Sequence, residues 1–114
     1  MHEITVEKDG RATIVVAAGE LDAFVAPDLT DTFAGVAGDE RLVTDLSAVS
    51  FLDSTALGLI VRAVRAADEN GDGVRVVLPR GSARRIFEIT TLDRVLPIAE
   101  SREAALSELG DGVV

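Results

Sequence analysis

The chain has 114 residues, which suits one domain with a modest core, and 47% of them are hydrophobic. A formal net charge of -9 disfavours nucleic acid and anionic lipid as partners, because both are bound through clusters of Lys and Arg. The lack of cysteine excludes disulfides and thiolate metal sites, and the sequence carries neither a membrane-spanning apolar stretch nor a secretory signal. We therefore predict a single cytoplasmic domain over residues 1–114 that binds neither nucleic acid nor membrane.

The first half of the chain predicts a hairpin, a helix and a strand. Residues 3–19 alternate between apolar and polar and then become apolar, and the dipeptide Asp9-Gly10 between the two parts suits a tight turn. Residues 23–38 follow with helical periodicity, and residues 42–46 fit a β-strand that leads into a loop. The inward stripe of the predicted helix comprises Val25, Leu29, Phe33 and Val36.

An amphipathic helix is predicted after this loop. From Thr55 onward, apolar side chains recur every three or four positions for about four turns. The glycine-rich residues 69–73 then end the helix. Its inward stripe comprises Leu57, Ile60, Val61, Val64 and Ala67, and its outer face carries Arg62, Arg65 and Glu69.

The remaining residues continue the alternation of strands and helices. Residues 73–79 predict a buried strand, residues 83–92 a short helix, residues 95–100 a last short strand and residues 101–109 a closing helix capped by its first residue, a serine. The short helix is expected to turn inward Ile86, Phe87 and Ile89. This order predicts an α/β fold with a mixed, mostly parallel sheet of four to five strands and about four helices packed on it.

The polar triplet Asp53-Ser54-Thr55 falls at the start of a predicted helix, beyond the carboxyl end of a strand, where parallel sheets place functional groups. Asp53 or Ser54 can act there as an N-cap that accepts a backbone hydrogen bond. Ser54 can instead be a phosphorylation site, because a phosphate there meets unpaired amides and the positive end of the helix dipole. The residues alone leave both interpretations open.

Enzymatic functions are not predicted. The only histidine, His2, lies near the end of the chain, so Ser54 has no evident imidazole base for nucleophilic catalysis. A phosphoaspartate receiver domain needs a lysine late in the chain, whereas the only lysine, Lys8, lies in the opening hairpin. The sequence has no phosphate-binding loop and no cluster of metal ligands, so we predict no cofactor and no metal site.

Three segments resemble the STAS-domain family of anti-sigma factor antagonists, also called anti-anti-sigma factors, which act in bacterial partner switching. Residues 19–29 (GELDAFVAPDL) resemble the early Gly-x-Leu-Asp segment of the family. Residues 43–63 resemble its Asp-Leu, Phe-hydrophobic-Asp-Ser and Leu-Gly signature, and residues 74–98 resemble the later strand and Arg-bearing helix. The match covers nearly the whole chain and implies a STAS fold.

The resemblance implies a regulatory function without catalysis. In the family, the unphosphorylated protein binds a cognate anti-sigma factor, a serine kinase with a histidine-kinase-like ATPase fold, and so releases a sigma factor. The kinase phosphorylates the serine after the motif aspartate, here Ser54, with Thr55 as the less favoured acceptor, and a phosphatase restores binding. We expect a monomer or weak dimer whose partner-binding residues include Asp22, Asp53, Ser54, Thr55 and Gly58.

Glycines and small residues near the motif carry further expectations. By the resemblance, Gly19 allows a tight backbone turn, and the missing side chain of Gly58 allows close approach of the sheet or of a partner. Thr55 and Ala56 stand where the family often has serine and glycine, so two methyl groups are expected next to the acceptor. Two alternatives remain: a scaffold subunit of a stressosome-like or transporter-associated complex, and nucleotide binding at the same edge of the sheet.

Overall fold

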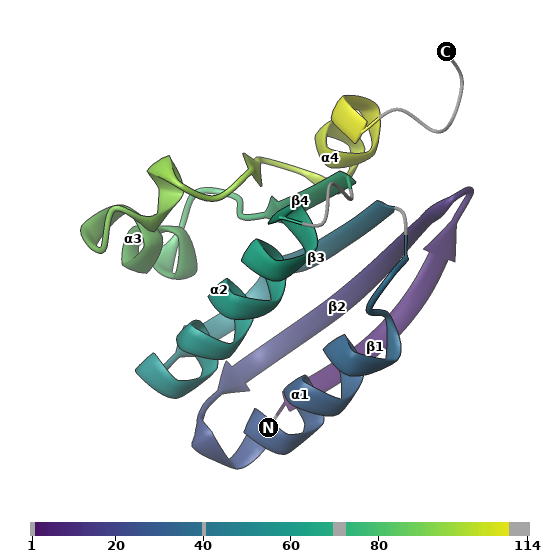
Figure 1. Cartoon of the computed structure of the whole chain (residues 1–114). Helices are drawn as coiled ribbons and strands as arrows, with labels where there is room; N and C mark the ends of the chain where they lie inside the picture. Colours follow the sequence, from purple (N-terminus) through teal and green to yellow (C-terminus); the bar gives the residue numbers. More distant parts are fainter. Residues whose placement is uncertain (1, 40, 70–72, 110–114) are drawn as a thin grey trace.

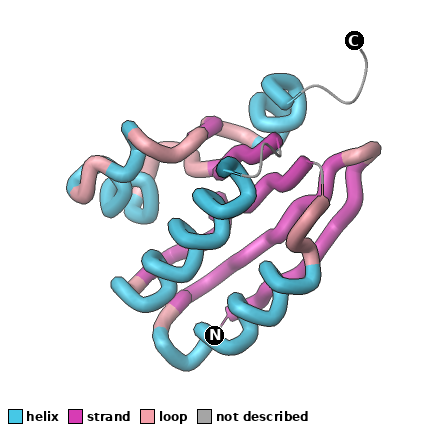
Figure 2. The backbone as a smooth tube through the Cα atoms, in the orientation of Figure 1, coloured by secondary structure: helices cyan, strands magenta, loops and turns pink. Residues whose placement is uncertain are grey.

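The computed structural model describes residues 2–39, 41–69 and 73–109, in which five strands form one sheet (Figures 1 and 2). The strands lie in chain order across the sheet; β1 is antiparallel to β2, and every other neighbouring pair is parallel. They are β1 (His2–Asp9), β2 (Ala12–Leu21), β3 (Arg41–Leu52), β4 (Gly73–Val77) and β5 (Ile98–Ala99). The predicted mixed, mostly parallel sheet that opens with a hairpin is confirmed.

As predicted, three of the helices that the structure describes lie between strands along the chain and a fourth follows the last strand. They are α1 (Ala26–Gly35), α2 (Ser54–Glu69), α3 (Ser82–Ile89) and α4 (Arg102–Leu109), with short 3-10 turns η1 (Ala23–Val25) and η2 (Leu92–Arg94). None of the helices described is both long and apolar enough to cross a lipid bilayer.

The opening hairpin turns one residue later than its dipeptide signal predicts. Asp9 still pairs with Ala12, so the two-residue loop consists of Gly10 and Arg11. Gly10 has φ of 60°, the left-handed region that glycine enters without a steric penalty. The glycine therefore occupies the first central position of the turn.

The sheet is covered on both faces, and the central strands are buried on both sides as a result. The larger core lies under α1, α2 and α3 and includes Ala17 of β2 and Leu46 of β3. The smaller core lies on the other face, where Ile14 and Val43 from the same two strands pack with α4. This double coverage explains why most of β2 reads as a continuous apolar run.

Strand β3 is longer than predicted, because it continues to Leu52 where a loop was expected after residue 46. The additional residues pair with β2, through register partners that include Glu20 with Phe51 and Leu21 with Leu52. Two irregularities in the β2–β3 register interrupt the simple alternation that a sequence pattern can detect. Helix α2 accordingly begins at Ser54, one residue before the predicted start.

In helix α3, one of the three residues predicted to face the core does not do so. Phe87 is fully buried and Ile86 packs against the core, but Ile89 is 74% exposed. Because each residue of a helix turns by about 100°, Ile89 lies about 200° around the axis from Phe87. Ala83, one turn before Phe87, is the buried partner on that face.

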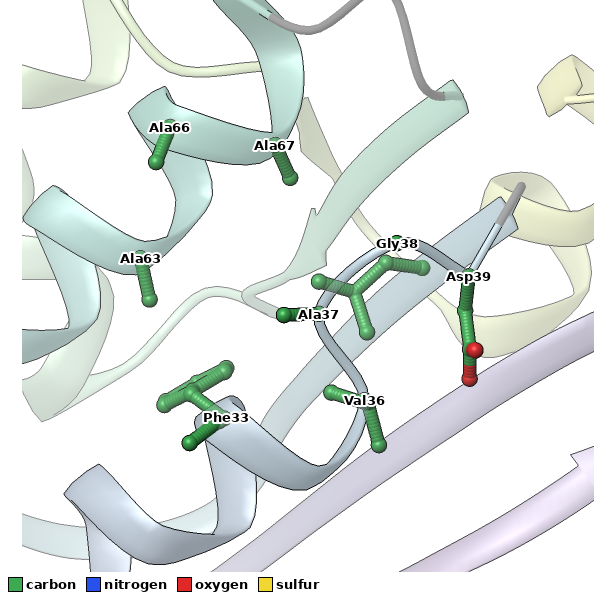
Figure 3. Close-up of a pocket in the computed structure, with 10 residues that line it drawn as sticks. Phe33, Val36, Ala37, Gly38, Asp39, Ala63, Ala66 and Ala67 are labelled. Atoms are coloured by element: carbon green, nitrogen blue, oxygen red, sulfur yellow. The ribbon is translucent and has the colours of Figure 1, made fainter.

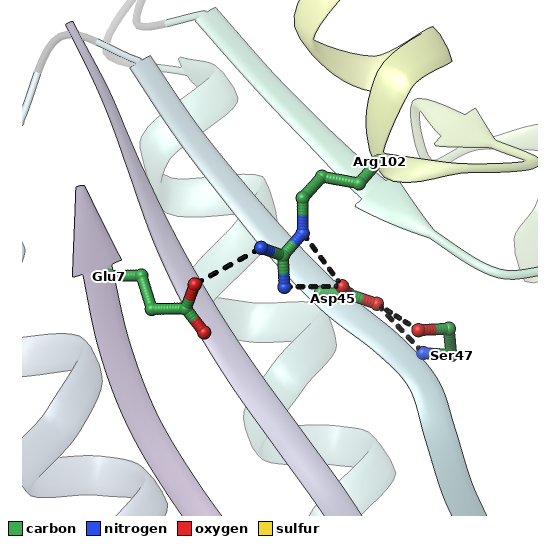
Figure 4. A network of polar contacts seen from close by, with 4 residues as sticks. All are labelled: Glu7, Asp45, Ser47 and Arg102. Carbon is green, nitrogen blue, oxygen red and sulfur yellow. Dashed lines mark hydrogen bonds and ion pairs between the residues drawn. The ribbon is translucent and has the colours of Figure 1, made fainter. Parts of the chain in front are cut away.

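Helix α4 is held on the sheet by an ionic network around the buried carboxylate of Asp45 (Figure 4). Arg102 donates to Asp45 Oδ2 at 3.0 and 3.2 Å and to Glu7 Oε1 at 3.1 Å, and Ser47 donates to Asp45 Oδ1 from its amide and its hydroxyl. Burial alone raises the pKa of Asp45, but the hydrogen bonds from Ser47 and Arg102 outweigh it and hold this pKa below its ordinary value. The predicted cap is also confirmed, since Ser101 Oγ accepts from the amide of Ala104 at 3.0 Å.

Candidate functional site

The candidate site lies where β2 and β3 end side by side. Leu21 and Leu52 are register partners in these parallel strands, and Asp22 and Asp53 follow them directly. The amide of Asp53 donates to the carbonyl of Leu21 at 3.0 Å, so the two strand ends are joined beyond the last ladder pair. Two segments that are far apart in the sequence thus meet at the carboxyl edge of the sheet.

Asp53 holds this junction together through both of its carboxylate oxygens. Oδ1 accepts from the amide of Ala56 at 2.9 Å, which caps the first turn of α2. Oδ2 accepts from the amide of Ala23 at 3.0 Å, which ties η1 to the start of α2. The cap interpretation is therefore confirmed for Asp53, and the same side chain also fixes the loop that follows β2.

Asp22 organises the neighbouring turn. Its Oδ1 accepts from the amide of Phe24 at 2.9 Å, and its carbonyl accepts from the amide of Val25 at 3.1 Å. Val25 is buried in the core and anchors the end of the turn. Asp22 is thus the N-cap of η1, which accounts for its place in the turn independently of any contact with a partner.

Ser54 is the first residue of α2, and its side chain is exposed. Among the residues that the structure describes, no side chain or backbone group hydrogen-bonds to its hydroxyl. Thr55 is exposed as well, whereas Ala56 is fully buried in the main core. The expectation that two methyl groups crowd Ser54 is therefore wrong for Ala56, whose methyl group points into the protein.

The two glycines of the motif behave differently from each other. Gly19 has φ of 83° and lies in β2 where the register with β3 shifts, so its backbone does require glycine. Gly58 lies within α2, and a Cβ added there meets no atom within 4 Å. The expected close approach of the sheet to Gly58 is wrong, and approach of a partner remains a prediction.

Phe24 is the feature of this edge that the sequence analysis missed. Its side chain is 92% exposed, although it sits one residue from the buried Val25. The available signal was its position, because Phe24 falls outside the stripe of Val25 and Leu29 that faces the core. An aromatic side chain left off the buried stripe of a helical segment points to solvent or to a partner.

A shallow apolar pocket of about 220 Å³ lies elsewhere, between α1 and the second half of α2 (Figure 3). Its walls include Phe33 and Ala63, and Asp39 is the only charged residue among the described residues that line it. That carboxylate is already engaged by Thr13 at 2.7 Å and by Lys8 at 3.2 Å. The hydrogen bond from Thr13, with help from Lys8, lowers the pKa of Asp39, so this group completes an internal contact of the fold.

The architecture and this edge define a mixed α/β domain that presents a serine at a helix N-terminus. Residues 3–105 match the STAS domain, and the chain belongs to that family. An anti-sigma-B factor antagonist of Staphylococcus aureus is 31% identical over an alignment of 91 residues, and the match covers 78% of this chain and 84% of that protein.

Solved structures share the fold. An anti-sigma factor antagonist from Mycobacterium paratuberculosis superposes with a TM-score of 0.87 at 30% identity and covers 96% of this chain and 94% of its own. The Bacillus protein SpoIIAA in its phosphorylated form superposes with a TM-score of 0.71 at 18% identity and covers 95% of this chain and 100% of its own.

Proposed function

We propose that this protein is an anti-sigma factor antagonist controlled by phosphorylation of Ser54. Its unphosphorylated form binds an anti-sigma factor with serine kinase activity, and that binding releases a sigma factor. Phosphorylation of Ser54 by the bound kinase ends the complex, and a phosphatase restores the unphosphorylated form. The observation that carries this proposal is the exposed Ser54 hydroxyl at the first position of α2.

The hydrogen bonds around Ser54 support the proposal that a phosphate on this residue would weaken binding of a partner. The Asp53 carboxylate already accepts from the Ala56 amide and so occupies the capping position at this end of α2. A phosphate on Ser54 would meet a negative neighbour on that side, which favours its presentation outward. The added charge of about -1.5 to -2 then falls on the surface that a partner must cover.

The magnitude needed for switching is modest. A phosphate that costs the complex about 3 kcal/mol weakens binding more than a hundredfold. Charge repulsion and desolvation of a phosphate at an interface are of this order when no cationic side chain of the partner is placed to pair with the phosphate itself. The domain itself can stay folded, because the phosphate sits on an exposed side chain at the favourable end of a helix.

The test is incubation of the protein with ATP, Mg²⁺ and each kinase-type anti-sigma factor of its own genome, followed by intact-mass and peptide mass spectrometry. One phosphoryl group on Ser54 is expected. Ser54→Ala should bind the same anti-sigma factor but accept no phosphate, and Ser54→Asp should bind poorly. Thr55→Ala is the matched control, because it removes the neighbouring exposed hydroxyl and should be phosphorylated like the wild type.

Three outcomes would contradict the proposal. Phosphate on Thr55 in place of Ser54 would show that Ser54 is not the acceptor. Binding of Ser54→Asp with the affinity of the wild type would refute the charge mechanism. If no anti-sigma factor binds or phosphorylates the protein while light scattering shows large particles, the scaffold alternative is favoured.

A further inference from the structure

We infer that Phe24 is the apolar anchor through which this protein docks on its anti-sigma factor, and that the partner offers an apolar pocket with a basic rim. The inference rests on the function proposed above and adds the residue that contributes most to affinity and the chemistry that recognises it. Phe24 is the most exposed of the large hydrophobic side chains described, at 92%. An aromatic ring left in water at a candidate docking edge is the kind of residue that dominates binding energy in protein interfaces.

The backbone next to Phe24 is bonded to the residue that precedes the acceptor serine. Its neighbour Ala23 donates its amide to Asp53 Oδ2 at 3.0 Å, and Asp53 directly precedes Ser54. The turn that carries Phe24 also contacts α2. A partner that reaches the Ser54 hydroxyl therefore meets the Phe24 ring on the same edge of the domain.

The backbone of Phe24 is held in place before any partner binds. Its amide donates to Asp22 Oδ1 at 2.9 Å, the preceding amide donates to Asp53, and the following residue, Val25, is buried in the core. Three consecutive residues are thus fixed by hydrogen bonds or packing, while the ring between them remains exposed. Such an anchor loses little conformational entropy on binding, which favours affinity.

The charges around the ring specify the rim of the complementary pocket. Asp22 accepts from the amide of Phe24 and Asp53 accepts from the amide of the preceding residue, Ala23. Among the described residues, neither carboxylate has an ion pair with Lys, Arg or His. The chain as a whole carries a net charge of -9. A pocket for the ring must therefore present Arg or Lys at its edge to complement these carboxylates.

The experiment is a calorimetric titration of each variant with the anti-sigma factor that binds the wild type. Mg²⁺ and ADP are present, so that no phosphoryl transfer occurs. Phe24→Ala is expected to weaken binding by at least about 30-fold, the effect of losing a single interface hot spot. Val95→Ala is the matched control. Val95 is also an exposed apolar residue, at 60%, but it lies beside the C-terminal half of α2, away from Ser54. The affinity of Val95→Ala for the anti-sigma factor should therefore remain within about twofold of the wild type.

Thermal unfolding of Phe24→Ala checks that the effect is on binding, and an unchanged Tm is expected because the ring is exposed. If the wild type binds and Phe24→Ala binds equally well, the anchor is refuted while the proposed function stands. If no anti-sigma factor binds the wild type, both are overturned together. If light scattering shows a dimer that Phe24→Ala abolishes, the ring is covered by a second copy of this chain and the inference is wrong.

Discussion

Removal of the Asp53 carboxylate is expected to destabilise the domain far more than removal of the adjacent Ser54 hydroxyl. Asp53 accepts two backbone hydrogen bonds, at 2.9 Å from Ala56 and at 3.0 Å from Ala23. Asp53→Ala loses both and leaves two amides without their acceptor. Ser54→Ala removes an exposed hydroxyl without such contacts and should be nearly neutral.

The magnitude follows from the two bonds. Loss of a helix cap costs about 1 kcal/mol, and loss of the second hydrogen bond costs about 1 kcal/mol more. With an unfolding entropy of about 2.1 cal/mol/K per residue, a chain of 114 residues has about 0.24 kcal/mol/K in total. A destabilisation of about 2 kcal/mol therefore lowers Tm by about 8 °C.

Asp53→Asn separates the two contributions, because its side chain keeps one acceptor oxygen and replaces the other with a donor. It should lose one of the two bonds and show about half the decrease in Tm, near 4 °C. The assay is calorimetry or circular dichroism at pH 7 with Ser54→Ala as the control. If Asp53→Ala melts within about 1 °C of Ser54→Ala, the claim that this carboxylate holds the two segments together is wrong.

Three further predictions concern stability. The pKa of Asp45 is lower in the folded than in the unfolded state, so the Asp45 carboxylate stabilises the fold above about pH 4, and this stabilisation is lost as the pH falls through the folded pKa. In thermal melts from pH 3 to 7, the difference in Tm between the wild type and Asp45→Asn should therefore become smaller in acid. Gly58→Ala should raise the free energy of unfolding by about 0.5–1 kcal/mol, since the new methyl group meets open space. Gly19→Ala should lower the free energy of unfolding by about 1–2 kcal/mol, because the φ of Gly19 is 83°. Urea unfolding that ranks the two variants in another order would contradict this prediction. Thr44→Val should be neutral or stabilising by up to about 1 kcal/mol in the same assay, because the buried Thr44 hydroxyl has no hydrogen-bond partner among the described residues. A clear decrease in the free energy of unfolding would show that this hydroxyl has a hydrogen-bond partner in solution.

Local patterns predicted the order and type of the elements. The stripe of α2 is confirmed by the burial of Ile60 and Val64 and by the exposure of Arg62 and Arg65. These features depend on side chains three or four residues apart, which any helix brings together. The cap of α4 is equally local, because Ser101 and the amide that it accepts from are three residues apart.

Predictions failed where burial depended on a neighbouring element. Residues 47–52 are strand because β2 runs alongside them, and the exposed polar residues Ser47 and Ser50 among them conceal this in the sequence. Ile89 is apolar and follows Phe87 closely, yet the direction in which α3 packs leaves it in solvent. Neither result depends on local propensity, so the pattern of one segment could not provide it.

Local sequence patterns established the order and type of the elements, the position of Ser54 at the start of a helix and the resemblance to the STAS family. The surroundings of Ser54 depend instead on contacts between distant segments. The bond from Ala23 to Asp53 joins residues 30 positions apart, and the bonds from Arg102 to Asp45 span 57 positions. Such contacts depend on how parallel strands align and where each one ends, and that alignment is set by packing of the whole domain, not by the residues on either side of the contact.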